Sequence, residues 1–225
     1  MRLSSVQTQQ IDRTAHRAPQ VIVRVSSPQS NDFDAVREHV DHIVRHGQLG
    51  LEMDYGDLMQ GASVGRRFME QTDLDLEEYR RRLELTVPRG KRLPKLVHKI
   101  ILSMPAGTSP VGLLAAARTF LREQFGSEHR YAFVLHTDRP HPYVHVVVKA
   151  VSEQGVRLHI RKPILRRWRT EFARHLRQQN IAASATRGDA RGSKPKAIYH
   201  TERRGTSIRL RLESVASQRS SGQSS

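Results

Sequence analysis

Residues 136–148 read HTDRPHPYVHVVV and join a cluster of histidines to a run of β-branched residues. Successive side chains of a β-strand point to opposite faces of a sheet. The alternating spacing therefore places His141, Tyr143 and His145 on one face of a strand over residues 141–148. This stretch predicts a strand that carries imidazole groups on one side.

A further histidine adjoins this strand. His136 closes the apolar run of residues 131–135, and a bend at residues 139–140 would return the chain beside that run. Histidines on two adjacent strands can hold a divalent metal ion, so we predict a metal site in a β-hairpin. The alternative is a solvated cluster near a turn, because the 12 histidines are spread through the chain.

The composition limits the classes of partner. Lys plus Arg number 38 against 22 Asp plus Glu, so the formal net charge is +16 and a polyanion is the first expected partner. Nucleic acid is favoured over a membrane surface, because the pattern contains no basic amphipathic helix with large aromatic residues. The absence of cysteine excludes disulfides and thiolate chemistry. No apolar window reaches the roughly 18 residues of a membrane span, so we expect no membrane insertion and a cytoplasmic protein.

Hydrophobic periodicity predicts an α+β fold. The apolar spacing predicts helices over residues 33–46, 66–85, 110–125 and 162–179. Apolar and β-branched runs predict strands over residues 20–25, 96–104, 131–135, 141–148 and 156–160. Residues 49–63 give a weak signal and are interpreted as a loop. These elements predict a central antiparallel sheet of about five strands with helices packed on it.

The chain divides by composition into three regions. Residues 1–18 are polar without a period and are expected to form a flexible arm. Residues 19–192 are expected to form the folded domain. Residues 193–225 are basic and rich in Ser and Arg, and we expect a flexible tail there.

Five stretches, in this order, resemble the relaxases, the mobilisation nucleases of conjugative plasmids and integrative elements. The closest likeness is to the branch of the HUH endonuclease superfamily that contains the T-DNA border endonucleases of plant-transforming bacteria. The stretches are RAPQVIVR at 17–24, the motif around His42 and Gly47, SMPAGT at 103–108, HTDRPHPYVHVVV at 136–148, and the basic segment from ASATR at 183–187 through Arg191 and Gly192. One stretch alone is weak evidence, whereas all five in order are typical of this family.

The resemblance implies a relaxase-like fold and a defined chemistry. Such a domain would hold single-stranded DNA at a transfer origin, and a divalent metal ion, Mn²⁺ or Mg²⁺, would polarise the scissile phosphate. A nucleophile on the first helix would attack and stay joined to the 5′ phosphate, leaving a free 3′ hydroxyl. The implied partners are accessory relaxosome proteins and a type IV coupling protein, in the bacterial cytoplasm or during export with the DNA. Relaxases often continue into further regions, so a chain of 225 residues is consistent with part of a longer protein.

The residue expected to attack the DNA departs from the family pattern. The family's usual nucleophile is a tyrosine where this chain has His42, five residues before Gly47. Neutral imidazole is a competent nucleophile towards phosphorus, so we predict that His42 carries the reaction. Two alternatives stay open, namely that Tyr55 in the following loop takes over or that the centre is inactive. An inactive centre would make the protein an accessory DNA-binding factor at the transfer origin.

The expected metal ligands also depart from the family pattern. The family's metal ligands are a histidine at the start of the hairpin motif and a His-x-His pair at its end, and here Tyr143 replaces the first member of that pair. The resemblance therefore implies His136 and His145 as ligands. His141 is the expected third ligand if the strand bends. Asp138 and Tyr143 are expected to adjoin the ligands and support them without binding the metal ion themselves.

Further residues are expected to contact DNA. Ser103 and Thr108 match the family's second motif, for which a simple strand-end turn is the alternative. The basic side chains expected to bind phosphates are Arg45, Arg161, Lys162, Arg166, Arg187 and Arg191. A solvated basic face is the alternative for these side chains.

Overall fold

The computed structural model describes residues 18–26, 30–74, 81, 85, 93–126 and 128–185. The chain separates into two units, Met1–Thr186 and Arg187–Ser225, and every described residue belongs to the first. The arm and the tail expected from the sequence lie outside the described residues, apart from Ala18. Within the described part, no helix is both long and apolar enough to cross a membrane.

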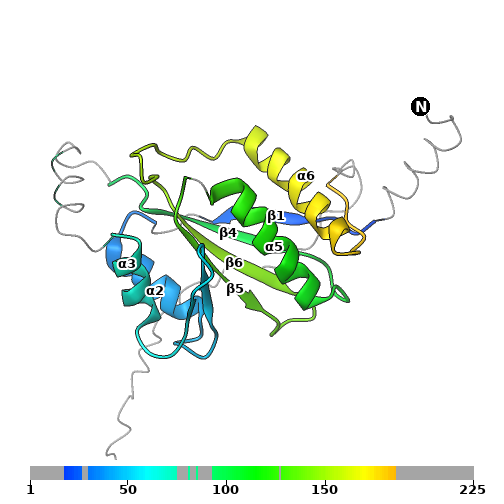
Figure 1. The fold of residues 1–225 in the computed structure, drawn as a ribbon, viewed down its shortest axis with the longest axis horizontal. Helices are drawn as coiled ribbons and strands as arrows, with labels where there is room; N and C mark the ends of the chain where they lie inside the picture. Colours follow the sequence, from blue (N-terminus) through cyan, green and yellow to red (C-terminus); the bar gives the residue numbers. More distant parts are fainter. Residues whose placement is uncertain are drawn as a thin grey trace, which may run out of the picture. The chain divides into compact units, whose positions relative to one another are not determined.

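The described residues form a six-stranded sheet with the strand order β1-β4-β6-β5-β2-β3 (Figure 1). Each neighbouring pair is antiparallel. The strands are β1 (Ile22–Ser26), β2 (Leu51–Met53), β3 (Leu58–Met59), β4 (Val97–Ser103), β5 (Tyr131–His136) and β6 (Tyr143–Lys149). This confirms the predicted α+β class and its antiparallel sheet.

Three details of the strand prediction were wrong. Residues 49–63 contain β2 and β3, whose three and two residues are too few to show a period. Residues 156–160 form no strand, because the N–H of Leu158 bonds to Ala150 while its carbonyl accepts from the ring of His98, so no ladder continues. The strand β6 begins at Tyr143, which leaves His141 in the bend before it.

Four helices are described, namely α2 (Phe33–Ile43), α3 (Val64–Gln71), α5 (Pro110–Phe125) and α6 (Lys162–Gln178). The bounds of α5 match the prediction, and its cap is the side chain of Ser109, which accepts from the Gly112 N–H. The helix predicted over residues 66–85 was wrong as one unit. It ends at Gln71, because Asp73 takes a left-handed φ of 54°.

The two faces of the sheet carry separate hydrophobic cores. Val144 and Val146 of β6 belong to the core that includes α5 and α6, whereas Val147 belongs to the core that includes α2 and α3. Since side chains alternate along a strand, Tyr143 and His145 lie on the α2 side of the sheet. The fold therefore turns the conspicuous histidines towards the first described helix.

Candidate functional site

The β5–β6 hairpin brings three aromatic rings together where the two strands meet their bend. His136 at the end of β5 pairs with Tyr143 at the start of β6, and His145 pairs with Val134. The ring centroid of His136 lies 4.9 Å from that of Tyr143 and 4.8 Å from that of His145. The predicted bend between the strands is confirmed, and it places two of the predicted ligands side by side.

His136 is the most enclosed of these rings. It is 3% exposed, and neither of its ring nitrogens has a hydrogen-bond partner among the described residues. Burial is the main cause that lowers the pKa of His136, with a smaller opposing effect from the backbone of Ile43. The nearest carboxylate oxygen, on Asp138, lies 3.8 Å from Nδ1, which is too long for a hydrogen bond. A buried imidazole without a good hydrogen bond carries a cost that a metal ion would remove. These atoms fit a metal ligand.

His145 is held in the same neutral state. Burial is the main cause that lowers the pKa of His145 to about 3, and His136 and His42 lower it further. Its ring is therefore unprotonated at physiological pH. A metal ion binds only the neutral imidazole, so this environment keeps a lone pair ready for an ion.

Tyr143 closes one side of the cluster. Its hydroxyl donates to the Asp138 carboxylate over 3.0 Å, and the Arg45 guanidinium donates to the other oxygen of that carboxylate over 2.6 Å. Burial and the bond to Asp138 raise the pKa of Tyr143 to about 12, so the phenol stays protonated. Asp138 thus ties the loop after α2 to the start of β6. The supporting role expected of Asp138 and Tyr143 has this geometric basis.

His39 is a site residue that the sequence reasoning missed. It lies on α2, and its ring centroid is 6.4 Å from that of His145. Burial is the main cause that lowers the pKa of His39 to about 3, and the Lys99 ammonium on β4 contributes next. The spacing from His39 to His42 is three residues, which puts both on one helix face. That spacing was the available signal.

His42 lies in the last turn of α2 and is exposed. It is near enough to lower the pKa values of His136 and His145, so the structure brings the predicted nucleophile to the predicted ligands. Tyr55 is elsewhere. The Arg130 guanidinium lies 4.9 Å from its ring centroid, and Arg130 precedes β5 at the end opposite His136, about 20 Å away along the strand.

His141 lies in the bend before β6. Its ring centroid is 6.0 Å from that of Tyr143. The ligand nitrogens of His136, His141 and His145 do not all come within 4.8 Å of one another in the described structure. A three-histidine site would therefore require side-chain rotation.

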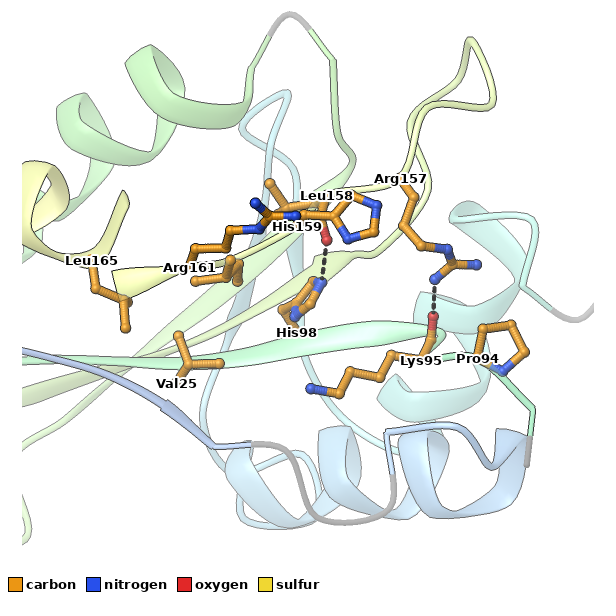
Figure 2. Close-up of a pocket in the computed structure, with 10 residues that line it drawn as sticks. Val25, Pro94, Lys95, His98, Arg157, Leu158, His159, Arg161 and Leu165 are labelled. Atoms are coloured by element: carbon orange, nitrogen blue, oxygen red, sulfur yellow. Dashed lines mark hydrogen bonds between the residues drawn. The ribbon is translucent and has the colours of Figure 1, made fainter. Parts of the chain in front are cut away.

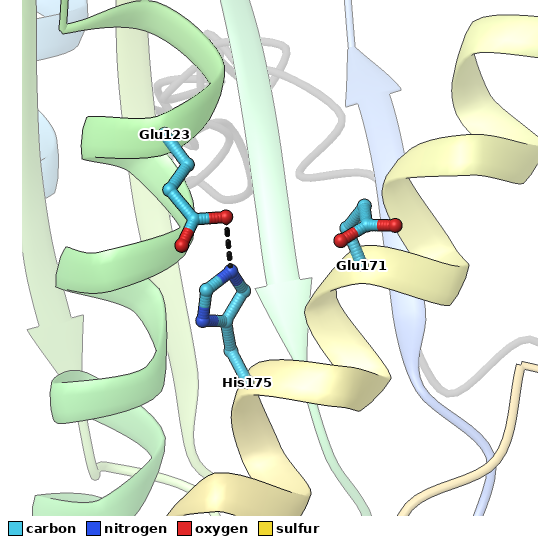
Figure 3. Close-up of side chains that lie close together, drawn as sticks. All are labelled: Glu123, Glu171 and His175. Carbon is cyan, nitrogen blue, oxygen red and sulfur yellow. Dashed lines mark hydrogen bonds and ion pairs between the residues drawn. The ribbon is translucent and has the colours of Figure 1, made fainter.

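In the described part of the chain, one set of three possible metal ligands does have its ligand atoms within 4.8 Å of one another, and it lies between α5 and α6. It consists of Glu123, Glu171 and His175 (Figure 3). The Arg174 guanidinium donates to Glu123 over 2.6 Å and to Glu171 over 2.8 Å, and His175 contacts Glu123 over 3.0 Å. The arginine bridges both carboxylates, so this group is an ion-pair network between two helices.

The predicted DNA contacts are distributed over both faces of the sheet. Ser103 is fully buried and its hydroxyl donates to the Pro142 carbonyl over 3.1 Å, while the Thr108 hydroxyl donates to Pro105 over 2.9 Å. Arg45 lies at the histidine cluster. The three basic residues at the start of α6 are exposed on the opposite side of the sheet, namely Arg161, Lys162 and Arg166. Arg187 and Arg191 lie outside the described residues.

Comparison with known proteins assigns this chain to a family. The family model described as "Relaxase: MobA/VirD2-like, nuclease domain" matches residues 60–181, which include β4, α5 and the histidine hairpin. The chain belongs to the relaxase family. The family resemblance read from the motifs is thereby confirmed, and so is the relaxase-like fold. Relaxases bind single-stranded DNA and use a divalent metal ion.

Curated relatives of this relaxase carry the name "T-DNA border endonuclease VirD2". The protein from Agrobacterium fabrum is 33% identical over 202 residues, covering 82% of this chain and 43% of the relative. The protein from Rhizobium rhizogenes is 30% identical over 141 residues, covering 57% of this chain and 30% of the relative. The relaxase chain thus spans less than half the length of the relatives it matches.

Proposed function

We propose that this relaxase nicks single-stranded DNA at the transfer origin of a conjugative or mobilisable element, with His42 as the nucleophile. The observation that carries the proposal is the position of His42. It is exposed in the last turn of α2, three residues after His39, whose ring centroid lies 6.4 Å from that of His145. A solvent-accessible nucleophile on the helix that faces the predicted ligands suits metal-assisted phosphoryl transfer.

In the proposed step, a ring nitrogen of His42 uses its lone pair to form an N–P bond with the scissile phosphate. The P–O bond to the 3′ oxygen breaks, and that oxygen leaves with the electron pair and takes up the proton that the phosphorylated ring releases. The products are a phosphohistidine joined to the 5′ end of one strand and a free 3′ hydroxyl on the other. The step is reversible, because the 3′ hydroxyl can attack the phosphorus and re-form the P–O bond while the N–P bond breaks and the ring takes back the proton.

A divalent metal ion, Mn²⁺ or Mg²⁺, would be held by His136 and His145, with His141 and His39 as the imidazoles available for a third position. When bound, the ion would supply charge neutralisation at the phosphate. The residues of the chain prepare this site in two ways. Burial keeps both ligand rings unprotonated, and the bonds from Tyr143 and Arg45 to Asp138 hold the bend beside them.

A second candidate is a catalytically inactive relaxase that binds DNA at the transfer origin as an accessory protein. Tyr143 favours this candidate, because its protonated phenol stacks on His136 where the family has a histidine. Both candidates predict binding of single-stranded DNA and differ only in cleavage.

The cellular setting is also a proposal. VirD2 is named as a T-DNA border endonuclease, and by analogy this chain would act in the bacterial cytoplasm and be exported with the DNA. Accessory relaxosome proteins and a type IV coupling protein are the proposed partners. A pull-down with the chain in a strain that carries its element would test them.

The decisive experiment is the trapping of covalent protein–DNA adducts. The protein is incubated with Mn²⁺ and a random-sequence pool of single-stranded DNA, and adducts are isolated and sequenced. The variants are His42→Ala, His42→Tyr and Tyr55→Phe, with His46→Ala as a matched control at a neighbouring exposed histidine. We expect adducts from the parent protein, Tyr55→Phe and His46→Ala, and none from His42→Ala.

The chemistry of the adduct identifies the nucleophile independently. A phosphoramidate at histidine is labile to acid, whereas the phosphotyrosine formed by His42→Tyr would survive it. Adducts that persist in His42→Ala would exclude His42 as the nucleophile. Retained DNA binding with no adduct in any metal would select the accessory protein instead.

A further inference from the structure

Two isoleucines continue the histidine face of the sheet towards β1. Ile101 of β4 lies directly opposite His145, and Ile22 of β1 lies directly opposite Ser103. Residues that are paired across antiparallel strands share a face of the sheet. Since Val97 belongs to the core under α2 and α3, alternation along β4 places Ile101 and Ser103 on that face as well. Both isoleucines therefore lie on the same side of the sheet as the histidine cluster.

The other face of β1 and β4 carries a separate feature. Val25 and His98 line a pocket of about 350 Å³ there, together with Leu165 of α6 (Figure 2). Val25 and His98 each stand three residues from the isoleucine of their own strand, and an odd spacing puts two side chains on opposite faces. The pocket therefore lies on the α6 side, away from both isoleucines.

The isoleucines lie where the packing of α2 and α3 on the sheet stops. The core under these helices includes residues of β2, β3, β5 and β6, but among the described residues it contains none from β1 and only Val97 from β4. Ile22 and Ile101 belong to neither core and are partly exposed, whereas Val23 and Leu102, on the other face of the same strands, are fully buried. Covering apolar surface that faces water is favourable, so this patch favours a ligand with an apolar face.

The patch is continuous with the histidine cluster. Neighbouring strands lie about 5 Å apart, so Ile101 is one strand spacing from His145, and Ile22 is two strand spacings from Tyr143. Ile22 and Ile101 are also diagonal neighbours, because Ile22 pairs with Ser103, two residues beyond Ile101. Diagonal neighbours lie about 7–8 Å apart, which is close enough for one ligand group to contact both side chains.

We propose that Ile22 and Ile101 form an apolar floor for one base of the single-stranded DNA whose phosphate is held at the histidine cluster. The place of that phosphate rests on the proposed function. A single strand leaves its bases unpaired, and every base has an apolar face that can lie on such a floor. A nucleotide joins its base to a phosphate, as the sheet joins the floor to the histidines. Isoleucine side chains form no hydrogen bonds, so the floor should accept all four bases.

The test measures the binding of single strands by the full chain carrying His42→Ala, so that cleavage does not intervene. Fluorescence anisotropy compares a short thymidylate strand with an abasic strand that has the same number of phosphates. We expect Ile101→Tyr to tighten thymidylate binding about fivefold or more, because an aromatic ring stacks on a base. Ile22→Ala should weaken thymidylate binding about threefold, because it removes apolar contact. Neither change should alter the affinity for the abasic strand.

Val156→Tyr and Val156→Ala are the matched controls, because Val156 is a β-branched residue, 62% exposed, beyond the end of β6 opposite Tyr143. They should change neither affinity, and an unchanged affinity for the abasic strand shows that a variant is folded. The floor is excluded if both strands respond equally to Ile101→Tyr, if Val156→Tyr has the same effect, or if neither isoleucine variant changes binding. Base-dependent effects without adducts in the nicking experiment would count against His42 alone, whereas adducts without base-dependent effects would exclude the floor alone.

Discussion

At the scale of single residues, Tyr143 determines how the histidine cluster differs from its family pattern. Its phenol stacks on His136, and its hydroxyl is committed to Asp138. A neutral phenol is a poor ligand for a divalent ion compared with imidazole. The chain thus keeps two imidazoles of the expected set, the buried His136 and the half-buried His145, and places a hydrogen-bonded ring in the remaining position.

Replacing Tyr143 by histidine should strengthen metal binding. The Tyr143 ring centroid lies 4.9 Å from that of His136 and 5.3 Å from that of His145, so the new imidazole would adjoin both. A third nitrogen ligand should raise the affinity for Mn²⁺ about tenfold or more. Calorimetric titration measures this change. Tyr143→Phe is the matched control, because it removes only the bond to Asp138. An affinity in Tyr143→His no higher than in Tyr143→Phe would mean that position 143 does not face the ion.

At the scale of elements, the loop after α2 sets where His42 stands. The helix ends at Ile43, and Arg45, His46 and Gly47 all have positive φ. The Gly47 carbonyl accepts a hydrogen bond from the Gly61 N–H over 3.1 Å. This bond joins the turn before α3 to the loop after α2. A Cβ on Gly47 would collide with the carbonyl oxygen of Gly61. Glycine is therefore required by both conformation and contact.

The substitution Gly47→Ala should destabilise the protein more than Gly56→Ala. Both glycines have a φ above 90°, but only Gly47 has a neighbour within reach of a new Cβ. We expect a loss of about 1 kcal/mol in the free energy of unfolding for Gly56→Ala and about 2–4 kcal/mol for Gly47→Ala. Urea denaturation of the two variants measures the difference. Equal losses would show that the contact between the two loops is easily relaxed.

At the scale of the whole molecule, buried neutral histidines couple stability to pH. The pKa values of His39, His98 and His145 fall to between about 3 and about 4, well below that of an exposed imidazole. Below pH 6.5 the unfolded chain binds protons that the folded chain does not, so acidification favours unfolding. Above pH 6.5 both states are neutral at these positions, and this contribution to the pH dependence vanishes.

We predict that stability falls as the pH is lowered from 6.5 to 4, and that His98→Gln makes the fall shallower. The glutamine amide can still donate to the Leu158 carbonyl but does not titrate. The difference in slope should be at most about 1.4 kcal/mol per pH unit, because one proton is removed from the linkage. Urea midpoints at several pH values measure it, with the exposed His46→Gln as the control. Parallel curves for parent and His98→Gln would contradict the prediction.

The net charge of +16 makes a further prediction about DNA binding. Each phosphate neutralised adds about −0.7 to the log–log salt slope for a single strand. If Arg161, Lys162 and Arg166 contact the strand, changing all three to Gln should therefore make the slope about 2 less negative. Fluorescence anisotropy at several salt concentrations measures this. The control is a triple change to Gln at Arg37, Arg66 and Arg122. A slope that is unchanged in both triple variants would show that the cations at the start of α6 face solvent and do not contact the strand.

The sequence by itself determined the elements whose signals are local. The 16 residues of α5 were predicted with their bounds, because helical periodicity, Pro110 and Gly126 all act within a few residues. The hairpin of β5 and β6 was likewise readable, since alternation and an intervening proline bend are local features. That hairpin is what brings His136 beside His145.

Only the tertiary structure decided which distant residues join that hairpin. Long-range strand pairing places Lys99 of β4 beside the hairpin and leaves Tyr55 at the far end of β5. Helix packing brings His39 of α2 to the histidine face of the sheet and puts the cations of α6 on the opposite face. Burial, which lowers the pKa values of these imidazoles, depends on the packing of both sheet faces. The sequence gives the residue types. The face of the sheet that each element covers decides which residues become neighbours and which imidazoles stay unprotonated.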